Sequence, residues 1–151
     1  MSLIPKRGTV YVVDDDEAVR QAIDAHPHVQ LVHEIPHPEV LRQLGQVKVH
    51  VLPSFRESPG LTTIEALFAG CNIVTSGPAH CPVEYYRFGR LGTQCDPFSV
   101  GSIRRSILHE LNAPRPQLPD DYFDVYSYRN AAKLTALAYR QLESTRTGDG
   151  P

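Results

Sequence analysis

The chain has 151 residues, enough for one domain with a hydrophobic core, and its formal net charge is −2. This near balance argues against a nucleic-acid-binding or membrane-surface protein, because both carry a basic excess. No stretch approaches the roughly 18 apolar residues of a membrane span, and no apolar run follows Lys6 and Arg7 as a signal peptide requires. The three cysteines form no C-x-x-C pair, which predicts reduced, buried thiols in a cytoplasmic protein.

The N-terminal part is expected to contain a tail, a strand and a helix. Residues 1–8 read as a tail, and Thr9–Val13 has the β-branched character of a strand. The acids Asp14–Asp16 follow and are expected to cap a helix over 17–25, because acidic side chains are favoured at a helix N-terminus. The strand and helix would form the first unit of an α/β domain.

This start also resembles the first strand and helix of response-regulator receiver domains, in which such paired acids bind magnesium beside a phospho-accepting aspartate. The resemblance implies an aspartate at the end of the third strand and a lysine before a proline near the fifth. The corresponding stretches here read Leu52-Pro53-Ser54 and Cys95-Asp96-Pro97. A helix cap is therefore the favoured interpretation of Asp14–Asp16, and a receiver-like signalling module is kept as an alternative function.

The next stretch is rich in histidine and is expected to hold a strand over 28–33 and a short helix over 39–44. Five histidines fall between His26 and His50, which raises the question of a metal site. However, Pro36 and Pro38 prevent a regular helix from carrying both His33 and His37, and no H-E-x-x-H or Cys/His cluster occurs. The sequence therefore predicts no metal site and no bound cofactor.

The central stretch, 49–76, is expected to form one βαβ unit with a parallel sheet. Val49–Leu52 is a short apolar strand, and a turn leads to Gly60. A helix with apolar residues at helical spacing runs from there to Gly70, a typical C-terminal glycine, and a second strand occupies 71–75.

Two carboxylates distinguish this unit. Glu57 lies in the turn before the helix, and Glu65 lies inside a helix that is otherwise apolar, where a carboxylate is costly unless it is hydrogen-bonded. The N–H groups near Gly60, Leu61 and Thr62 would be free at the helix N-terminus, which favours anions such as a diphosphate. The unit thus predicts an anion site with a carboxylate on each side.

The remaining chain continues the alternation of strands and helices. The expected elements are a loop at 77–81, a short helix at 82–88, a strand at 91–95, a helix that Ser99 caps and that runs to about Leu111, a connector at 113–119 and a final helix within 120–142. The helix after Ser99 is expected to bury Ile103, Ile107, Leu108 and Leu111, and the final helix has an apolar stripe of Ala131, Leu134, Leu137, Ala138 and Leu142. The pattern predicts an α/β fold: a Rossmann-like, three-layer α/β/α domain over 9–142, with a flexible tail at 143–151.

The phrase P-S-x-x-E-S-P-G-L-T-x-x-E-A-L-x-A-G, with its Glu-x7-Glu pair, resembles the donor-binding motif of retaining GT-B glycosyltransferases of family 4 (glycosyl transferases group 1). The resemblance covers about residues 28–142. It implies that Glu65 binds the ribose of a nucleotide-sugar, Glu57 contacts the sugar, and the N–H groups near Gly60–Thr62 hold the diphosphate. It also makes Ile35 a residue of the base pocket.

The resemblance implies half of a GT-B fold, the donor-binding half of an enzyme that transfers a hexosyl group to a sugar or lipid-linked acceptor. The acceptor-binding N-terminal domain is missing, as are the Arg and Lys by which family members reach the donor phosphates, so the chain alone is expected to lack full activity. Ser58-Pro59 also replaces the Gly-Phe of many members. A ligand-free chimeric or truncated α/β scaffold is the further alternative, and the final helix offers a surface for self-association.

Overall fold

The computed structural model of the chain describes residues 10–13, 21, 26–32, 35–58, 60–87 and 89–146. The chain divides into two compact units, Met1–Pro116 and Gln117–Pro151. The expected tail at 1–8, the aspartates Asp14–Asp16 and nearly all of the helix expected over 17–25 lie outside the described residues.

Two parallel sheets form the framework of the first unit. Their strands are β1 (Val10–Val13), β2 (Val29–Val32), β3 (Val49–Leu52), β4 (Asn72–Ser76) and β5 (Thr93–Cys95). β1 pairs with β2, and the larger sheet has the order β3-β4-β5, with Val49 opposite Asn72 and Val74 opposite Thr93. Each strand lies within two residues of its prediction. The sequence predicted one sheet, however, whereas the pairing of the described residues gives two.

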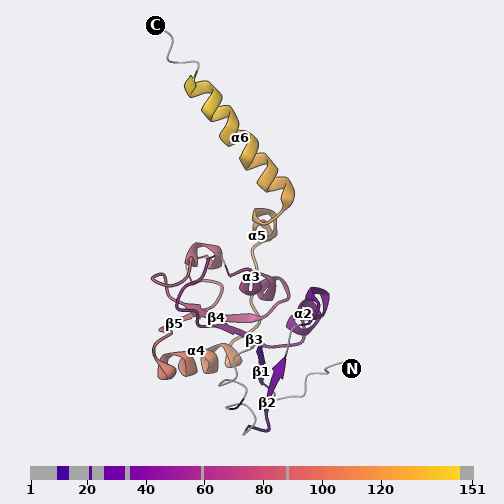
Figure 1. The fold of residues 1–151 in the computed structure, drawn as a ribbon, viewed down its shortest axis with the longest axis vertical. Helices are drawn as coiled ribbons and strands as arrows, with labels where there is room; N and C mark the ends of the chain where they lie inside the picture. Colours follow the sequence, from indigo (N-terminus) through magenta and orange to yellow (C-terminus); the bar gives the residue numbers. More distant parts are fainter. Residues whose placement is uncertain are drawn as a thin grey trace. The chain divides into compact units, whose positions relative to one another are not determined.

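Helices cover both faces of the larger sheet. The helical segments of the first unit whose bounds lie within the described residues are α2 (His37–Leu44), α3 (Leu61–Phe68), the 3-10 helix η1 (Val83–Tyr86) and α4 (Val100–Asn112). In Figure 1, α3 lies on one side of the three-stranded sheet and α4 on the other. The fold is therefore α/β, with a three-stranded parallel sheet packed against helices in a Rossmann-like architecture, as the alternation of elements predicted.

The core of this unit centres on β4, which is buried along its whole length. Ile73 and Val74 of β4 and Leu67 of α3 are each at most 1% exposed. β5 comes so close to β4 that a Cβ added to Gly92 would lie 2.3 Å from Cγ1 of Ile73. Only glycine allows the backbone to approach at this point.

The cysteines confirm the prediction of buried, unpaired thiols. Cys71, Cys81 and Cys95 are free and buried, and the Sγ of Cys71 donates a hydrogen bond to the carbonyl of Leu44 at 3.0 Å. Burial raises the pKa of the Cys71 thiol to about 11 and also raises the pKa of the other two. All three are therefore held in the protonated, unreactive form.

The predicted buried face of α4 is wrong in part. Ser99 caps the helix as expected, since its side chain accepts from the N–H of Ser102. Leu108 and Leu111, however, are 45% and 48% exposed, and the buried side chains are Ser106 and Glu110. The reason is that β5 offers hydrogen bonds to this face: Ser106 Oγ donates to the carbonyl of Gln94 at 3.2 Å, and Thr93 Oγ1 donates to the Glu110 carboxylate.

The described part of the second unit, residues 117–146, contains two helices where the sequence predicted one. They are α5 (Asp120–Val125) and α6 (Tyr128–Arg146). The rings of Tyr122 and Tyr126 meet edge to face, with centroids 5.3 Å apart, and Ser127 begins α6 by accepting from the N–H of Asn130 at 3.1 Å. The apolar stripe predicted on the last helix is exposed at Ala131, Leu134, Leu137, Ala138 and Leu142.

Candidate functional site

The N-terminus of α3 begins at a glycine in a left-handed conformation. Gly60 has φ 67° and ψ 55° and, as the N-cap residue, has no side chain with which to cap the helix. Its carbonyl accepts from the N–H groups of Thr63 and Ile64 at 2.9 and 3.3 Å, whereas Leu61 and Thr62 are exposed. The first turn of α3 therefore presents uncapped N–H groups at an open, electropositive end.

Packing and capping fix α3 in this position. The helix buries Thr63, Ile64, Ala66 and Leu67. At its C-terminus Gly70 has φ 82°, its N–H bonds to the carbonyl of Leu67, and the N–H of Cys71 bonds to the carbonyl of Ala66, both at 2.9 Å. This pair of bonds is the Schellman motif, as the glycine predicted.

Glu57 lies beside the N-terminus of α3, as the sequence predicted for the preceding turn. Its Cγ would be 3.1 Å from a Cβ added at Gly60. Its carboxylate accepts from Ser54 Oγ and from the N–H of Ser58, each at 3.1 Å, and its own N–H donates to the carbonyl of His80 at 2.8 Å. The carboxylate is therefore oriented by the protein, and it retains lone pairs for a ligand.

Glu65 makes its contact with another helix. Its Oε1 lies 2.8 Å from Nε2 of His37, with side-chain exposures of 29% for Glu65 and 64% for His37. This contact supplies the hydrogen bond that a carboxylate in an apolar helix was expected to need. Sequence reasoning missed His37, because only the folded chain brings α2 against α3; the one available signal was that Glu65 required a partner.

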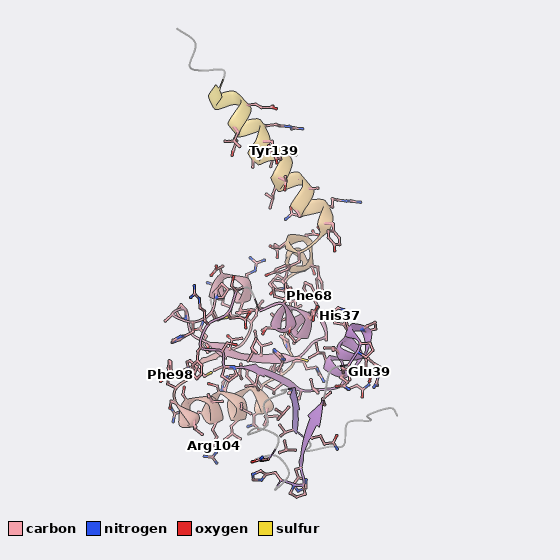
Figure 2. All side chains as sticks on the ribbon, viewed as in Figure 1. His37, Glu39, Phe68, Phe98, Arg104 and Tyr139 are labelled. Atoms are coloured by element: carbon pink, nitrogen blue, oxygen red, sulfur yellow. The ribbon has the colours of Figure 1, made fainter. Side chains whose placement is uncertain are left out.

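An open cavity of about 380 Å³ borders Glu65. It is lined by Leu41 of α2 and by Glu65, Phe68 and Ala69 at α3 and its end. Figure 2 shows His37 and Phe68 on these two neighbouring helices. The surface of the cavity combines apolar side chains with a single carboxylate. This combination suits a ligand that has both a flat ring and hydroxyl groups.

The predicted site residues fall into two groups. Glu57 lies with Gly60, Leu61 and Thr62 at the start of α3. Ile35 is half-buried and lies two positions before His37, at the entrance to α2, so it belongs to the side of the molecule that carries Glu65. No hydrogen bond joins the two carboxylates within the described part of the chain, because Glu57 adjoins the start of α3 whereas Glu65 lies in its second turn.

A polar contact between two side chains links β3 to α3. His50 of β3 has Nε2 3.1 Å from Oγ1 of Thr63, which is fully buried. Burial lowers the pKa of His50 to about 4, so its ring is neutral at physiological pH. Burial also raises the pKa of Tyr86, whose hydroxyl lies against Gly60. No pattern in the sequence predicts this role for His50.

No family model matches the chain, and no curated protein shows significant sequence similarity to it. Among the described residues, no group of three or more His, Cys, Asp or Glu side chains is placed to hold a metal ion. None of the helices in the described ranges combines the length and the apolar character needed to span a bilayer.

Proposed function

We propose that the chain is the donor-binding domain of a retaining GT-B glycosyltransferase, as its motif at 53–70 suggests. The observation that carries the proposal is the arrangement along α3. An uncapped helix start lies beside an oriented carboxylate, Glu57, and a second carboxylate, Glu65, borders an open cavity. A nucleotide-sugar has the matching order of groups: a base and ribose, a diphosphate, and a hexose.

Each part of the donor has a candidate partner. The ribose hydroxyls would donate to Glu65, since a carboxylate accepts from vicinal hydroxyls, and the base would lie in the neighbouring cavity on the side of Ile35. The diphosphate would bind the N–H groups near Gly60, Leu61 and Thr62, where the helix dipole favours negative charge. Glu57 would accept from hydroxyls of the hexose.

The same arrangement would assist the transfer of the hexosyl group. As the bond between the sugar and the diphosphate breaks, negative charge grows on the diphosphate. The N-terminus of α3 would stabilise this charge with donors that are already oriented, so that little reorganisation is required during the reaction. The sugar or lipid-linked acceptor would be held by a second domain facing this one, so we expect the chain alone to bind the donor and to transfer little sugar.

The test is a thermal-shift titration with UDP, GDP and ADP and with their hexose conjugates. A ligand that binds only the folded protein raises its melting temperature by mass action, equivalent to about 2.7 kcal/mol at a hundredfold excess over Kd. We expect one nucleotide to raise the melting temperature of the wild type and to have little effect on Glu65→Ala.

The matched control is Glu143→Ala, which removes an exposed acid of α6 in the second unit. It should respond to the nucleotide as the wild type does. If no nucleotide or conjugate shifts a wild-type protein that melts cooperatively, or if Glu65→Ala responds equally, the proposed donor site is wrong.

A further inference from the structure

Three aromatic side chains gather where three parallel strands end. Phe55 follows β3, His80 follows β4 and Phe98 follows β5. The rings of Phe55 and Phe98 stack, with centroids 4.8 Å apart and planes at 26°, and His80 meets Phe98 edge to face at 5.5 Å. The carboxyl ends of parallel strands form one edge of a sheet, the edge at which open α/β sheets bind ligands. We call these three residues the aromatic cluster.

The cluster is ordered but exposed. Phe55 is 63% exposed and Phe98 is 71% exposed, although burying such rings would stabilise the fold. Hydrogen bonds hold the loops in place: the Nδ1–H of His80 donates to the carbonyl of Phe55 at 2.9 Å, and the N–H of Phe98 donates to the Asp96 carboxylate at 2.9 Å. Contacting apolar side chains left on the surface in this way form a candidate binding surface.

The cluster shares its loops with Glu57. The N–H of Glu57 donates to the carbonyl of His80 at 2.8 Å, and Glu57 lies two positions after Phe55. The edge therefore offers aromatic surface together with a carboxylate that Ser54 and Ser58 already orient. The cavity beside Glu65 is a separate place: Figure 2 shows Phe98 well apart from His37 and Phe68.

This pairing of groups matches the chemistry of a pyranose ring. One face of such a ring carries C–H bonds whose hydrogens are slightly positive, and the face of an aromatic ring is negative, so the two attract. The hydroxyl groups around the rim are donors, which a carboxylate accepts. A nucleobase would also stack on phenylalanine, but its N–H donors lie on part of its edge, whereas a pyranose carries hydroxyl donors around its rim.

We propose that Phe55, His80 and Phe98 form a stacking surface for a pyranose, and that Glu57 accepts hydrogen bonds from its hydroxyls. The inference deepens the proposed function and rests on it for the role of Glu57, while the cluster itself is a separate observation. The pyranose would come either from the hexose of the donor or from a saccharide acceptor. The two sources share the same ring chemistry, and the experiment below separates them.

The absence of tryptophan from the chain makes a direct reporter available. Phe98→Trp keeps an aromatic face at the exposed position and places the only indole of the protein there. We expect methyl glucoside, methyl mannoside or methyl galactoside to change its emission in a saturable way, and glycerol, which has no ring, to leave it unchanged. A tryptophan introduced by Tyr139→Trp, at an exposed position of α6, should respond to none of them.

The wild-type ring is tested by ligand-observed NMR with the same glycosides. Phe98→Leu keeps an apolar side chain but removes the aromatic face, and it should weaken binding about fivefold or more. Tyr139→Leu should bind as the wild type does, and all variants should keep the wild-type melting temperature to within a few degrees, since both positions are exposed. If no glycoside binds the wild type, or if Phe98→Leu binds equally well, the inference is overturned.

The source of the sugar is separated by comparing a nucleoside diphosphate with its hexose conjugate. If the donor hexose occupies the cluster, Phe98→Leu loses the extra affinity of the conjugate and keeps that of the nucleotide. If an acceptor sugar occupies it, both affinities persist and only the glycosides are lost. Glycoside binding without any nucleotide binding would overturn the proposed function and leave this inference standing. Nucleotide binding without any glycoside binding would overturn this inference and leave the proposed function standing.

Discussion

Nε2 of His37 lies 2.8 Å from Oε1 of Glu65, although 28 residues separate them in the sequence. His37 is the first residue of α2, and Glu65 lies in the second turn of α3. The contact joins the two helices beside the cavity and engages one oxygen of the carboxylate. The other oxygen is the one that a ligand's hydroxyl groups would reach.

Replacing each partner in turn separates binding from stability. Because both side chains are partly exposed, we expect His37→Ala and Glu65→Ala each to change the free energy of unfolding by less than about 1 kcal/mol. Glu65→Ala should lower nucleotide affinity about tenfold or more, since hydrogen bonds to a charged group contribute about 1.5 to 3 kcal/mol. His37→Ala should retain the affinity, because it leaves the carboxylate free. Titration calorimetry measures these differences, and an equal loss in both variants would contradict the assignment of ribose binding to Glu65.

Gly60→Ala tests the geometry at the start of α3. The added Cβ would lie 2.6 Å from the hydroxyl oxygen of Tyr86, in a backbone with φ 67° that disfavours side chains. We expect a loss of about 2 to 3 kcal/mol in the free energy of unfolding, measured by urea denaturation.

Two further variants locate the cause of that loss. Gly45→Ala should be neutral or stabilising by up to about 1 kcal/mol, because Gly45 has φ −62° and its Cβ would make ordinary contacts. Combining Gly60→Ala with Tyr86→Phe removes the hydroxyl from the crowded position. The double variant should therefore lose less free energy of unfolding than the sum of the losses of the two single variants. Strict additivity would show that the collision with Tyr86 is unimportant.

His50 should make the stability of the protein depend on pH. Its pKa is about 4 in the folded state against 6.5 for an ordinary histidine. Between these values the unfolded chain binds a proton that the folded chain does not, so the free energy of unfolding falls as the pH falls from 6.5 towards 4. Since the side chain is only partly buried, we expect His50 to contribute about 1 to 2 kcal/mol of this fall, less than the full shift implies.

The measurement is urea denaturation across that range for the wild type and for His50→Gln. The difference in free energy of unfolding between the two should shrink as the pH falls. The unfolded wild type gains a proton on His50 in this range, whereas glutamine in the variant does not titrate. His109→Gln, at an exposed position of α4, should keep the wild-type slope. If His50→Gln follows the wild type in parallel, another group is responsible.

Asn72 links β4 to the end of α4. Its Nδ2 donates to the carbonyls of Glu110 and Pro114 at 2.8 and 3.0 Å, and the first of these lies in the last turn of the helix, where carbonyls have no helical partner. Asn72→Ala should therefore cost about 2 kcal/mol in thermal or urea denaturation. Asn112→Ala removes an exposed bond to Leu108 and should cost less than about 1 kcal/mol. Equal losses would mean that Asn72 does not anchor the helix.

The sequence predicts well where adjacent residues determine the structure. The strand at Val49–Leu52 and the glycine that ends α3 follow from composition and turn chemistry within one stretch, whereas the left-handed conformation of Gly60 was not predicted. The same local rules predicted the cap at Ser99. They fail where a neighbour distant in the sequence decides, as on α4, where the hydrogen-bonding groups of β5 favour Ser106 and Glu110 over two leucines.

The candidate site divides in the same way. Glu57, Gly60 and Glu65 could be named from one continuous phrase, because they share a turn and a helix. His37 and the aromatic cluster could not, because the cluster draws on three loops and His37 approaches from another helix. Such contacts depend on the pairing order of the strands, which no short stretch encodes.

The three buried thiols give the protein a set of internal reporters. A reagent that modifies cysteine can react with Cys71, Cys81 or Cys95 only when the surrounding segment opens, because each side chain is buried and protonated. The labelling rate of each thiol is then proportional to the population of its open state. Mass spectrometry of the labelled peptides would therefore resolve three openings within a single native sample: that of the C-terminal end of α3, of the loop before η1 and of β5. A ligand bound at the carboxyl ends of the strands would slow the labelling of Cys81 and Cys95 more than that of Cys71.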